Sequence, residues 1–395
     1  MKRIIYLIIV VLMTATLITS CGNTKNKKSA NLHTLYFRDE SRSEEAVATF
    51  FNSDTEKSED VKMEKLESDG EASVFSCEGD TSAYNMVYIT YDGISTEKFA
   101  FNKCVSGWNN CSDGLMPYAY GEKINYTYKF KDVTLKCNGY DKTAHIWTPD
   151  DYNEKSVEKY ATIYALDGDA MVYLGQPGTT VSGCENIPEQ VKAMTAAVGF
   201  KAIVVAVETH GDENSCYRDD ELIPNLGKMA HEEGTSKKLG NEVADFISDT
   251  LIPYVQKHYN VYTDARHTAV TGVSLGGLES FYTAMAHSEK IGAAGCFSPS
   301  LWCYGDKAWK KFIKKTPFDN NAPFIYIYTG SGKNDTGKES VAMVKRLKKM
   351  GYPKDKLAFH YNKNGGHATP YWRNTFSEFL EAMFYHKVEG LGENL

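Results

Sequence analysis

Beyond residue 123 the chain alternates between short apolar runs and longer segments with a helical period. This alternation is typical of an α/β domain, because parallel strands are joined by a long crossover that is usually a helix. We therefore expect residues 123–395 to form an α/β domain with a mostly parallel sheet, entered through a hairpin over 133–147. The helical segment 241–258 contains Pro253, which we expect to kink or interrupt it. The further runs that we assign to strands of this sheet are 161–166, 202–207, 268–273, 324–328 and 357–361.

Residues 32–122 follow a different pattern, in which short alternating segments are separated by turn residues such as Asp69-Gly70 and Asp92-Gly93. Asp-Gly between apolar runs is a hairpin signal, and no helical period persists here, so we expect a small all-β sandwich. The segment order resembles the small carbohydrate-binding modules of the starch-binding type. That resemblance implies that Trp108, Tyr118 and Tyr120 stack on sugar rings, with a place in the core as the alternative.

The first twenty residues form a predicted export signal. Lys2 and Arg3 precede an apolar run over 4–18, which is shorter than the roughly 20 residues that a spanning helix needs. The sequence Leu17-Ile18-Thr19-Ser20-Cys21-Gly22 then resembles the bacterial lipobox, in which the cysteine is lipidated and becomes the new N-terminus. A simple signal peptide or membrane anchor with a chance cysteine is the alternative.

From the lipobox we expect a lipoprotein signal peptide over 1–20 and a lipidated Cys21 with a polar tether over 21–31. The protein would then be anchored to the cell membrane by its lipid and face outside the cytoplasm. Residues 22–31 are polar and basic, and their lysines stand where they can touch anionic headgroups. These lysines are Lys25, Lys27 and Lys28.

The net charge of −7 argues against a nucleic-acid partner, because proteins that bind nucleic acids usually carry an excess of Lys and Arg. Eight cysteines remain beyond Cys21, and an exported chain permits disulfides, whose pairing the sequence alone does not give. Cys104 and Cys111, which are near each other and flank Gly107-Trp108, are the pair that we favour. No Cys or His cluster has the spacing of a zinc site and no HExxH motif occurs, so we expect neither metal nor cofactor.

A nucleophile motif lies between a predicted buried strand and a helical run. Gly272-Val273-Ser274-Leu275-Gly276 fits G-x-S-x-G, and the helical run 278–287 follows it. A serine at the tip of such a turn is held in a strained backbone conformation, and small residues two positions away relieve the crowding. The helix N-terminus and the N–H of Leu275 then face an oxyanion. We predict that Ser274 is a catalytic nucleophile.

A serine hydroxyl needs a base to take its proton and an acid to orient that base. The loops after the last two predicted strands supply both, because Asp335 follows one strand and His367 follows the other after Gly365-Gly366. We therefore predict Asp335 as the acid and His367 as the base. His210 is the alternative base, and for Asp335 the alternatives are an ordinary surface turn or Glu339 in its place.

Ordered segments of the α/β part resemble the Putative esterase family of α/β-hydrolases, which includes feruloyl and acetyl-xylan esterases, esterase D and siderophore trilactone esterases. The resemblance covers residues 123–386 and implies an α/β-hydrolase fold and a serine carboxylic-ester hydrolase that works through an acyl-enzyme. The matching segments are Leu166-Asp167-Gly168-Asp169-Ala170, Arg218-Asp219-Asp220-Glu221-Leu222-Ile223-Pro224, Leu251-Ile252-Pro253-Tyr254-Val255, Ser298-Pro299-Ser300-Leu301-Trp302, Gly332-Lys333-Asn334-Asp335 and Gly366-His367.

The resemblance also implies further site residues. The second oxyanion N–H is expected near Asp169, since the His-Gly-Gly-Gly loop of lipases is absent. Three aromatic residues stand close in sequence to the predicted catalytic residues and are expected to line a substrate pocket, with core packing as the alternative. They are Trp302, Tyr371 and Trp372. Cys303 stands where relatives often carry a second aromatic residue, which leaves the shape of that pocket open.

Three functions fit these observations. The first is an anchored carbohydrate esterase that removes feruloyl or acetyl groups from polysaccharide, with the β-module holding the glycan. The second is a siderophore trilactone esterase, because the segment Ser298-Pro299-Ser300-Leu301-Trp302 also resembles the sequences of that branch of the family. The third is a binding protein or an acyltransferase that uses the fold without hydrolysis. The surface location favours the first, and the expected partner is an ester substrate linked to polysaccharide.

Overall fold

The computed structural model describes residues 32–53, 55–66, 72–96, 98–101, 107–111, 114–118, 130–171, 186–209, 218–230, 236–316, 318, 321–332, 335–363, 365–367 and 369–385. Residues 32–395 form one compact unit. The predicted signal peptide, Cys21 and the tether lie outside the described residues, as does Cys104, so the anchor and the disulfide stay predictions. Within the described ranges, no helix combines the length and the apolar character needed to cross a membrane.

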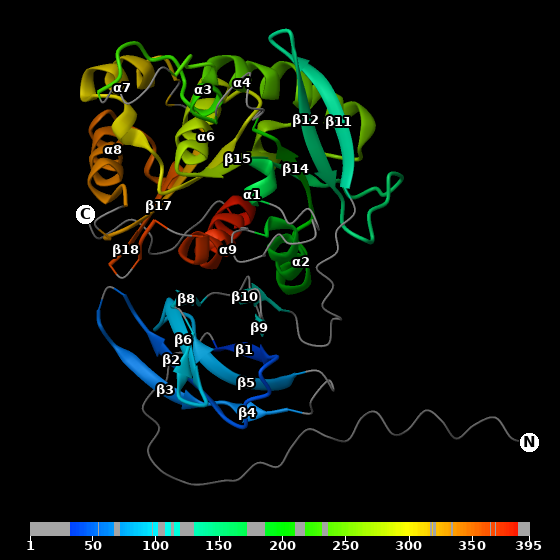
Figure 1. The fold of residues 1–395 in the computed structure, drawn as a ribbon, viewed down its shortest axis with the longest axis vertical. Coiled ribbons are helices and arrows are strands. Elements are labelled where there is room, and N and C mark those ends of the chain that lie inside the picture. Colours follow the sequence, from blue (N-terminus) through cyan, green and yellow to red (C-terminus); the bar gives the residue numbers. More distant parts are fainter. Residues whose placement is uncertain are drawn as a thin grey trace, which may run out of the picture. The chain divides into compact units, whose positions relative to one another are not determined.

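The N-terminal module consists of two small sheets, and all but one of their strand pairs are antiparallel (Figure 1). One sheet has the order β10-β9-β1-β5-β4, and the other has the order β3-β2-β6-β7 with β8 also paired to β6. One apolar cluster contains residues from both sheets, which confirms the predicted sandwich. The strands are β1 (Leu32–Asp39), β2 (Ala46–Phe51), β3 (Ser58–Lys62), β4 (Glu64–Lys65), β5 (Ser73–Asp80), β6 (Met86–Tyr91), β7 (Ile94–Ser95), β8 (Phe99–Ala100), β9 (Gly107–Cys111) and β10 (Gly114–Pro117).

Two aromatics that were expected to stack on sugars are instead buried in this module. Trp108 is 1% exposed and packs against Phe99 with ring centroids 4.9 Å apart, and Tyr118 is also buried. A sandwich of this size fills its core with its largest side chains, because little other apolar surface is available for burial. The sugar-stacking expectation is therefore wrong for Trp108 and Tyr118, and Tyr120 lies outside the described residues.

The predicted α/β domain is confirmed. Its sheet has the order β11-β12-β14-β13-β15-β16-β17-β18, and every pair from β14 onward in this order is parallel. β11 and β12 form the antiparallel entering hairpin. The strands are β11 (Phe130–Cys137), β12 (Tyr140–Trp147), β13 (Ala161–Leu166), β14 (Ala202–Val207), β15 (Thr268–Val273), β16 (Ala293–Phe297), β17 (Phe324–Gly330) and β18 (Leu357–Asn362).

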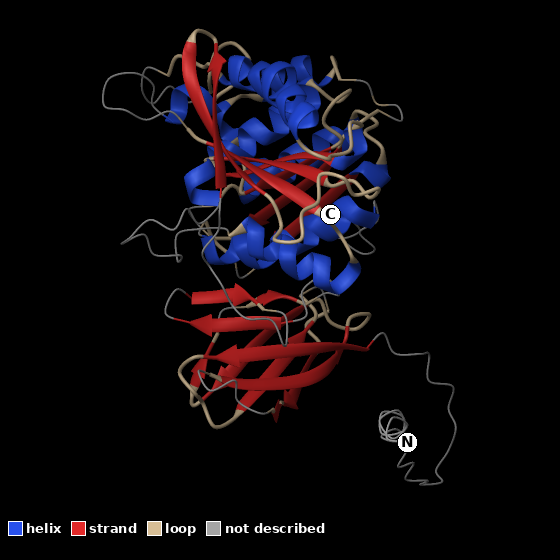
Figure 2. Cartoon of the chain, turned by 90° about the vertical axis from the view of Figure 1, so that its right-hand side faces the viewer, coloured by secondary structure: helices blue, strands red, loops and turns tan. Residues whose placement is uncertain are grey.

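Helices cover both faces of this sheet (Figure 2). Apolar residues of α1, α2 and α9 join one core cluster, and those of α3 to α8 join the cluster on the other face. The α-helices are α1 (Gly168–Met171), α2 (Ile187–Val198), α3 (Arg218–Leu222), α4 (Gly240–Phe246), α5 (Ile252–His258), α6 (Leu275–Ala286), α7 (Asp306–Ile313), α8 (Gly337–Lys349) and α9 (Thr369–Tyr385). Short 3-10 turns occur at η3 (Ala265–His267), η4 (Leu301–Cys303) and η5 (Lys354–Lys356).

Pro253 changes the helix that contains it without ending the helix. A π-helical segment, η2 (Ile247–Leu251), connects α4 to α5, and Pro253 is in the first turn of α5. Proline has no N–H to donate to the preceding turn, so one backbone hydrogen bond of the helix is missing. The π-helical segment accommodates the shifted hydrogen bonds, and the helix continues beyond it.

His145 on β12 is held between two carboxylates and makes the fold sensitive to pH. Its Nδ1 lies 2.7 Å from Asp132 Oδ1 and its Nε2 lies 2.6 Å from Glu208 Oε1. Burial alone would lower the pKa of His145, but the hydrogen bonds and charges of the two carboxylates raise it above its ordinary value.

We therefore expect the free energy of unfolding to fall as the pH rises. A raised folded-state pKa gives a stabilisation that is complete below about pH 6.5, the ordinary histidine pKa, and is lost as the pH rises through the raised value. Urea unfolding of the wild type and of His145→Gln across this range measures the effect. A stability difference between the two proteins that does not change with pH would contradict it.

Candidate active site

Ser274 occupies the turn between β15 and α6 with a strained backbone. Its φ is 58° and its ψ is −116°, and its N–H donates to the carbonyl of Phe297 at 2.9 Å. A Cβ on Gly272 would lie 2.6 Å from the carbonyl carbon of Gly276, so this turn requires glycine. The predicted geometry of a nucleophile at a strand-to-helix turn is present, with Leu275 as the first residue of the helix.

Asp335 and His367 meet although they come from different loops. Asp335 follows β17 and His367 follows β18, and Asp335 Oδ1 lies 3.2 Å from His367 Nδ1. The Asp335 side chain is 0% exposed, whereas that of His367 is 26% exposed. This pairing leaves Nε2 as the ring nitrogen that can take a proton from elsewhere.

The Asp335 carboxylate is held as an anion. Burial alone would raise its pKa, but hydrogen bonds from His367, from the N–H groups of Thr336 and Gly330 and from the Ser298 hydroxyl together lower the pKa below its ordinary value. Asp335 is therefore ionised at neutral pH. In that state it orients His367 and stabilises its protonated form.

The acid loop and the base loop are fastened to each other through their backbones. The N–H of Gly332 donates to the carbonyl of Gly365 at 3.1 Å, and the N–H of Ser331 donates to the carbonyl of Asn362 at 3.0 Å. A Cβ on Gly330 would overlap the backbone of Gly365, so only glycine allows this approach. The Asp335–His367 pair is thus fixed by two adjoining loops.

The segment after β16 reaches both the nucleophile and the base. The N–H of Ser300 donates to the carbonyl of Ser274 at 3.0 Å, and the two hydroxyl oxygens lie 3.4 Å apart. Ser298, at a φ of 42°, accepts a hydrogen bond of 2.8 Å from the Trp372 indole, whose ring stands edge-on to His367 with centroids 4.9 Å apart. Sequence reasoning assigned no role to Ser298 or Ser300. The signal was the Ser-Pro-Ser segment after a strand.

Hydrogen bonds and ring contacts join the predicted catalytic residues in two groups. Ser274 contacts Ser300, and His367 contacts Asp335 and Trp372. Among the hydrogen bonds of the described residues, none joins Ser274 to His367. Hydrogen bonds of this kind are often long without substrate and tighten when substrate binds.

The three aromatic residues that were predicted to line a substrate pocket differ in how far they are exposed. Trp372 is largely buried against His367, Tyr371 is partly buried near Gly366, and Trp302 on η4 is 36% exposed. Asp169 lies on α1 just beyond β13, and its oxyanion role stays a prediction. Of the alternatives, Glu339 lies on α8 while Asp335 makes the contact with histidine, and His210 is outside the described residues.

Asp167, whose side chain is 6% exposed, forms an ion pair with Arg218, whose side chain is 40% exposed, and this pair connects the turn after β13 to the turn at Ser274. Asp167, with a φ of 54°, accepts hydrogen bonds from Arg218 Nε at 2.7 Å and Nη2 at 2.6 Å. Arg218 Nη2 also lies 3.4 Å from the carbonyl of Val273, and a Cβ on Gly276 would lie 3.0 Å from Asp167 Oδ2. The carboxylate beside the nucleophile turn is therefore that of Asp167, and the Arg218 guanidinium compensates its charge.

Arg218 and Glu221 stand three residues apart on α3, and each makes an ion pair with the sheet. Glu221 Oε2 lies 2.7 Å from Lys142 Nζ, and both side chains are almost completely buried. Removing either partner would leave an uncompensated buried charge. These two pairs give a physical reason for the charged residues of the Arg-x-x-Glu-Leu-x-Pro segment.

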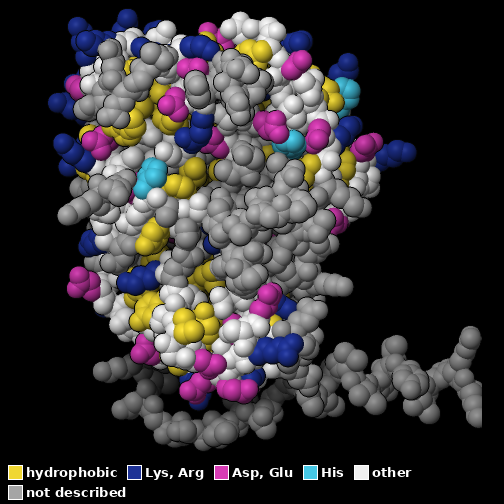
Figure 3. Space-filling view, viewed as in Figure 1, with side chains coloured by type: hydrophobic (Ala, Val, Ile, Leu, Met, Phe, Trp, Pro, Cys, Tyr) yellow, Lys and Arg dark blue, Asp and Glu magenta, His cyan; other side chains and the backbone are white. Residues whose placement is uncertain are grey.

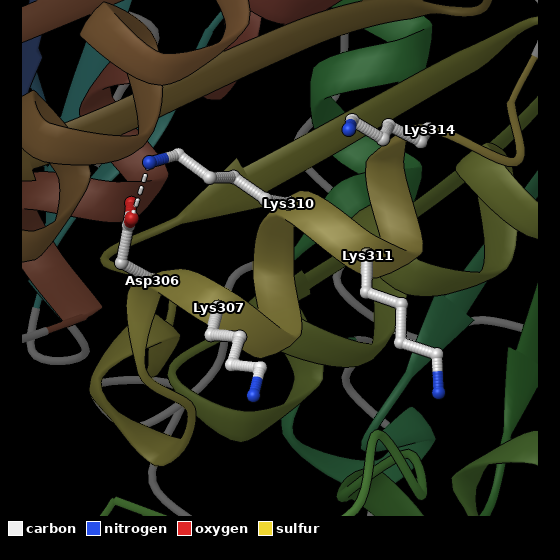
Figure 4. Close-up of a pocket in the computed structure, with 5 residues that line it drawn as sticks. All are labelled: Asp306, Lys307, Lys310, Lys311 and Lys314. Atoms are coloured by element: carbon white, nitrogen blue, oxygen red, sulfur yellow. Dashed lines mark ion pairs between the residues drawn. The ribbon is translucent and has the colours of Figure 1, made fainter.

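The concave surfaces and charged clusters do not suggest a metal centre. Among the described residues, no group of three or more His, Cys, Asp and Glu side chains could hold a metal ion. A depression of about 450 Å³ lies on α7 and contains none of the predicted catalytic residues (Figure 4). Its lining residues are Asp306, Lys307, Lys310, Lys311 and Lys314.

Comparison with known proteins assigns the α/β part to a family. The family model described as "Putative esterase" matches residues 138–383. The chain is 24% identical over 152 residues to the uncharacterized protein YbbA of Bacillus subtilis, covering 37% of this chain and 60% of that protein. It is 23% identical over 278 residues to an endo-1,4-beta-xylanase/feruloyl esterase of Xylanibacter ruminicola, covering 68% of this chain and 33% of that protein. The chain thus spans less than two thirds of either relative.

Solved structures share the fold. A CE1 ferulic acid esterase from Anaeromyces mucronatus matches with a TM-score of 0.51 and 18% identity, over 70% of this chain and 97% of that chain. An IroE-like serine hydrolase from Shewanella oneidensis matches with a TM-score of 0.50 and 15% identity, over 66% and 82%. The expected α/β-hydrolase fold is confirmed.

Proposed function

Because this chain belongs to the Putative esterase family and is a carboxylic ester hydrolase, we propose that it acts as a serine esterase with Ser274, His367 and Asp335 as its catalytic triad. The observation that carries the proposal is the combination of a strained serine between β15 and α6 with an ionised Asp335 bound to His367. A strained, half-buried serine and a histidine oriented by a carboxylate are the parts that acyl transfer requires.

In the proposed mechanism, Ser274 Oγ attacks the ester carbonyl while His367 Nε2 takes the hydroxyl proton. The N–H groups of Leu275 and Asp169 hold the negative oxygen of the tetrahedral intermediate. The intermediate collapses when the C–O bond to the alcohol breaks and His367 returns the proton to the leaving oxygen. Water then attacks the acyl-enzyme with His367 again as base, which releases the acid and regenerates Ser274.

For the substrate we propose a feruloyl or acetyl ester carried on polysaccharide. The relative from Xylanibacter ruminicola is named as a xylanase and feruloyl esterase, and a matching structure of the Anaeromyces mucronatus enzyme, with a TM-score of 0.50, is described in complex with ferulic acid. In this chain the exposed Trp302 follows the segment that contacts Ser274, so its ring is available to a planar acyl group. A siderophore trilactone is the competing substrate class.

We also propose that Cys21 is lipidated and holds the enzyme on the outer side of the cell membrane. The lipobox-like sequence supports this location. A polysaccharide substrate fits a location outside the cell, since such a polymer does not enter it. Glycan binding by the β-module would have to use residues other than Trp108 and Tyr118, because both are buried.

Replacing Trp302 with Ala tests the substrate. We expect kcat/KM for methyl ferulate to fall about fivefold, because an aromatic contact contributes about 1 kcal/mol, and the value for p-nitrophenyl acetate to fall less. Acetylated xylan and a catecholate trilactone complete the panel. Equal losses on ferulate and acetate would contradict the feruloyl assignment, and turnover of the trilactone alone would transfer the enzyme to the second class.

A further inference from the structure

The positive charge of this acidic chain is concentrated in one segment. Residues 306–356 contain thirteen Lys and Arg against five Asp and Glu, although the whole chain has a net charge of −7. The segment therefore has an excess of eight positive charges, and the rest of the chain has an excess of fifteen negative ones. The net charge of the whole chain conceals this separation.

Helix α7, which begins this segment, has an apolar inner face and a basic outer face. Trp309, Phe312 and Ile313 are buried in the core. In Figure 4 the side chains of Lys307 and Lys311 point in a common direction, away from the ion pair of Lys310 with Asp306. The exposed lysines of α7 and the turn after it are Lys307, Lys310, Lys311, Lys314 and Lys315.

Helix α8 extends the basic face. Arg346 lies 2.8 Å from Asp306 Oδ1, and Lys310 lies 2.5 Å from Asp306 Oδ2, so a single carboxylate on α7 is shared by two cations and ties α8 to α7. Lys338, Lys345, Lys348 and Lys349 are exposed on α8. Figure 3 shows Lys and Arg side chains gathered along the edge of the molecule where Figure 1 places α7 and α8.

We propose that this basic face, formed by the exposed lysines of α7 and α8, docks the enzyme on an anionic lipid surface. Lysine attracts lipid headgroups as a point charge, without the two-pronged recognition that arginine gives to a single carboxylate or phosphate. The one arginine of the segment, Arg346, is engaged with Asp306.

Two further observations favour lipid over an acidic polysaccharide. First, none of the described aromatic residues in 306–356 is exposed, so the basic face offers no ring on which a sugar could stack. Second, the predicted tether carries Lys25, Lys27 and Lys28 next to the lipobox cysteine. Both basic regions would then meet the same membrane, and the acidic remainder of the chain would be repelled by it.

Vesicle flotation tests the proposal with residues 22–395, which retain the whole compact unit over 32–395. Vesicles of phosphatidylcholine are compared with vesicles that also contain about 30% phosphatidylglycerol, at about 0.05 M and 0.5 M NaCl. The test variant is Lys307→Glu/Lys311→Glu/Lys314→Glu. The control variant, Lys155→Glu/Lys159→Glu/Lys257→Glu, has the same charge change at exposed lysines outside the basic face.

The parent should bind the anionic vesicles only, and high salt should release it. The test variant should lose about 100-fold in vesicle partitioning, since each basic residue near an anionic surface contributes about fivefold, whereas the control should lose far less. Absence of parent binding at low salt, or equal losses in both variants, overturns the proposal. Retention on polygalacturonate without vesicle binding also overturns it and assigns the basic face to an acidic polymer. Melting temperatures close to that of the parent report that each variant is folded, so the outcome is independent of the proposed triad.

Discussion

Ser274→Ala is expected to lower kcat for p-nitrophenyl acetate by at least about 10⁴-fold with little change in KM. The serine oxygen is the proposed point of acyl attachment, and its loss removes the group that attacks the ester. His367→Ala should cost a similar factor. The double variant should be no worse than either single one, because residues that act as a unit lose their effect together. Steady-state kinetics and mass detection of the acyl-enzyme measure both effects.

Matched variants separate these roles from general damage. His210→Ala and Glu339→Gln replace the alternative base and acid and should keep nearly full activity, whereas Asp335→Asn should lose most of it. Melting temperatures close to that of the parent show that the fold is intact. Loss of activity in His210→Ala with retention in His367→Ala would transfer the base to the other histidine and refute the assignment.

Arg218→Gln is expected to lower kcat about 100-fold while KM changes little, although Arg218 is placed outside the triad. Without the guanidinium, the Asp167 carboxylate would remain buried beside the nucleophile turn, with Thr209 as its other side-chain donor. An uncompensated negative charge there opposes the negative oxygen of the transition state. The effect should therefore appear in the chemical step more than in substrate binding.

The double variant Asp167→Asn/Arg218→Gln is the decisive control. It removes both charges, and asparagine keeps the shape of the Asp167 side chain, so it should recover at least about tenfold of the lost kcat. Melting temperatures of the single and double variants report stability separately. A double variant as slow as Arg218→Gln would mean that Arg218 acts on the backbone of Val273 rather than through the charge of Asp167.

Local patterns predicted much of this molecule because the physics behind them is local. The predicted bounds of β13, β14 and β15 agree with the structure to the residue. Strands that are buried on both faces have nearly continuous apolar runs, and these runs gave the prediction. The turn at Ser274 was predictable for the same reason, since the glycines that allow it lie two positions away on either side.

Contacts between distant residues could not be predicted in this way. Asp167 and Arg218 are 51 positions apart, and Ser298 and Trp372 are 74 positions apart, so no periodicity or turn rule connects them. The burial of Trp108 also depends on contacts between distant residues, and the sequence did not predict it. The resemblance to a carbohydrate-binding module suggested an exposed ring, but the packing of two sheets decided its burial.

The two-faced character of α7 bears on how such enzymes diverge. The inner side chains Trp309 and Phe312 are buried in the core, whereas the outer lysines Lys307, Lys311 and Lys314 are exposed. A few substitutions can therefore change the charge of the outer face, and none of the intermediate sequences is expected to lose much stability. Paralogues that catalyse the same reaction can in this way bind to different surfaces. The charge on the outer face of α7 would determine the surface, and that face takes no part in the reaction.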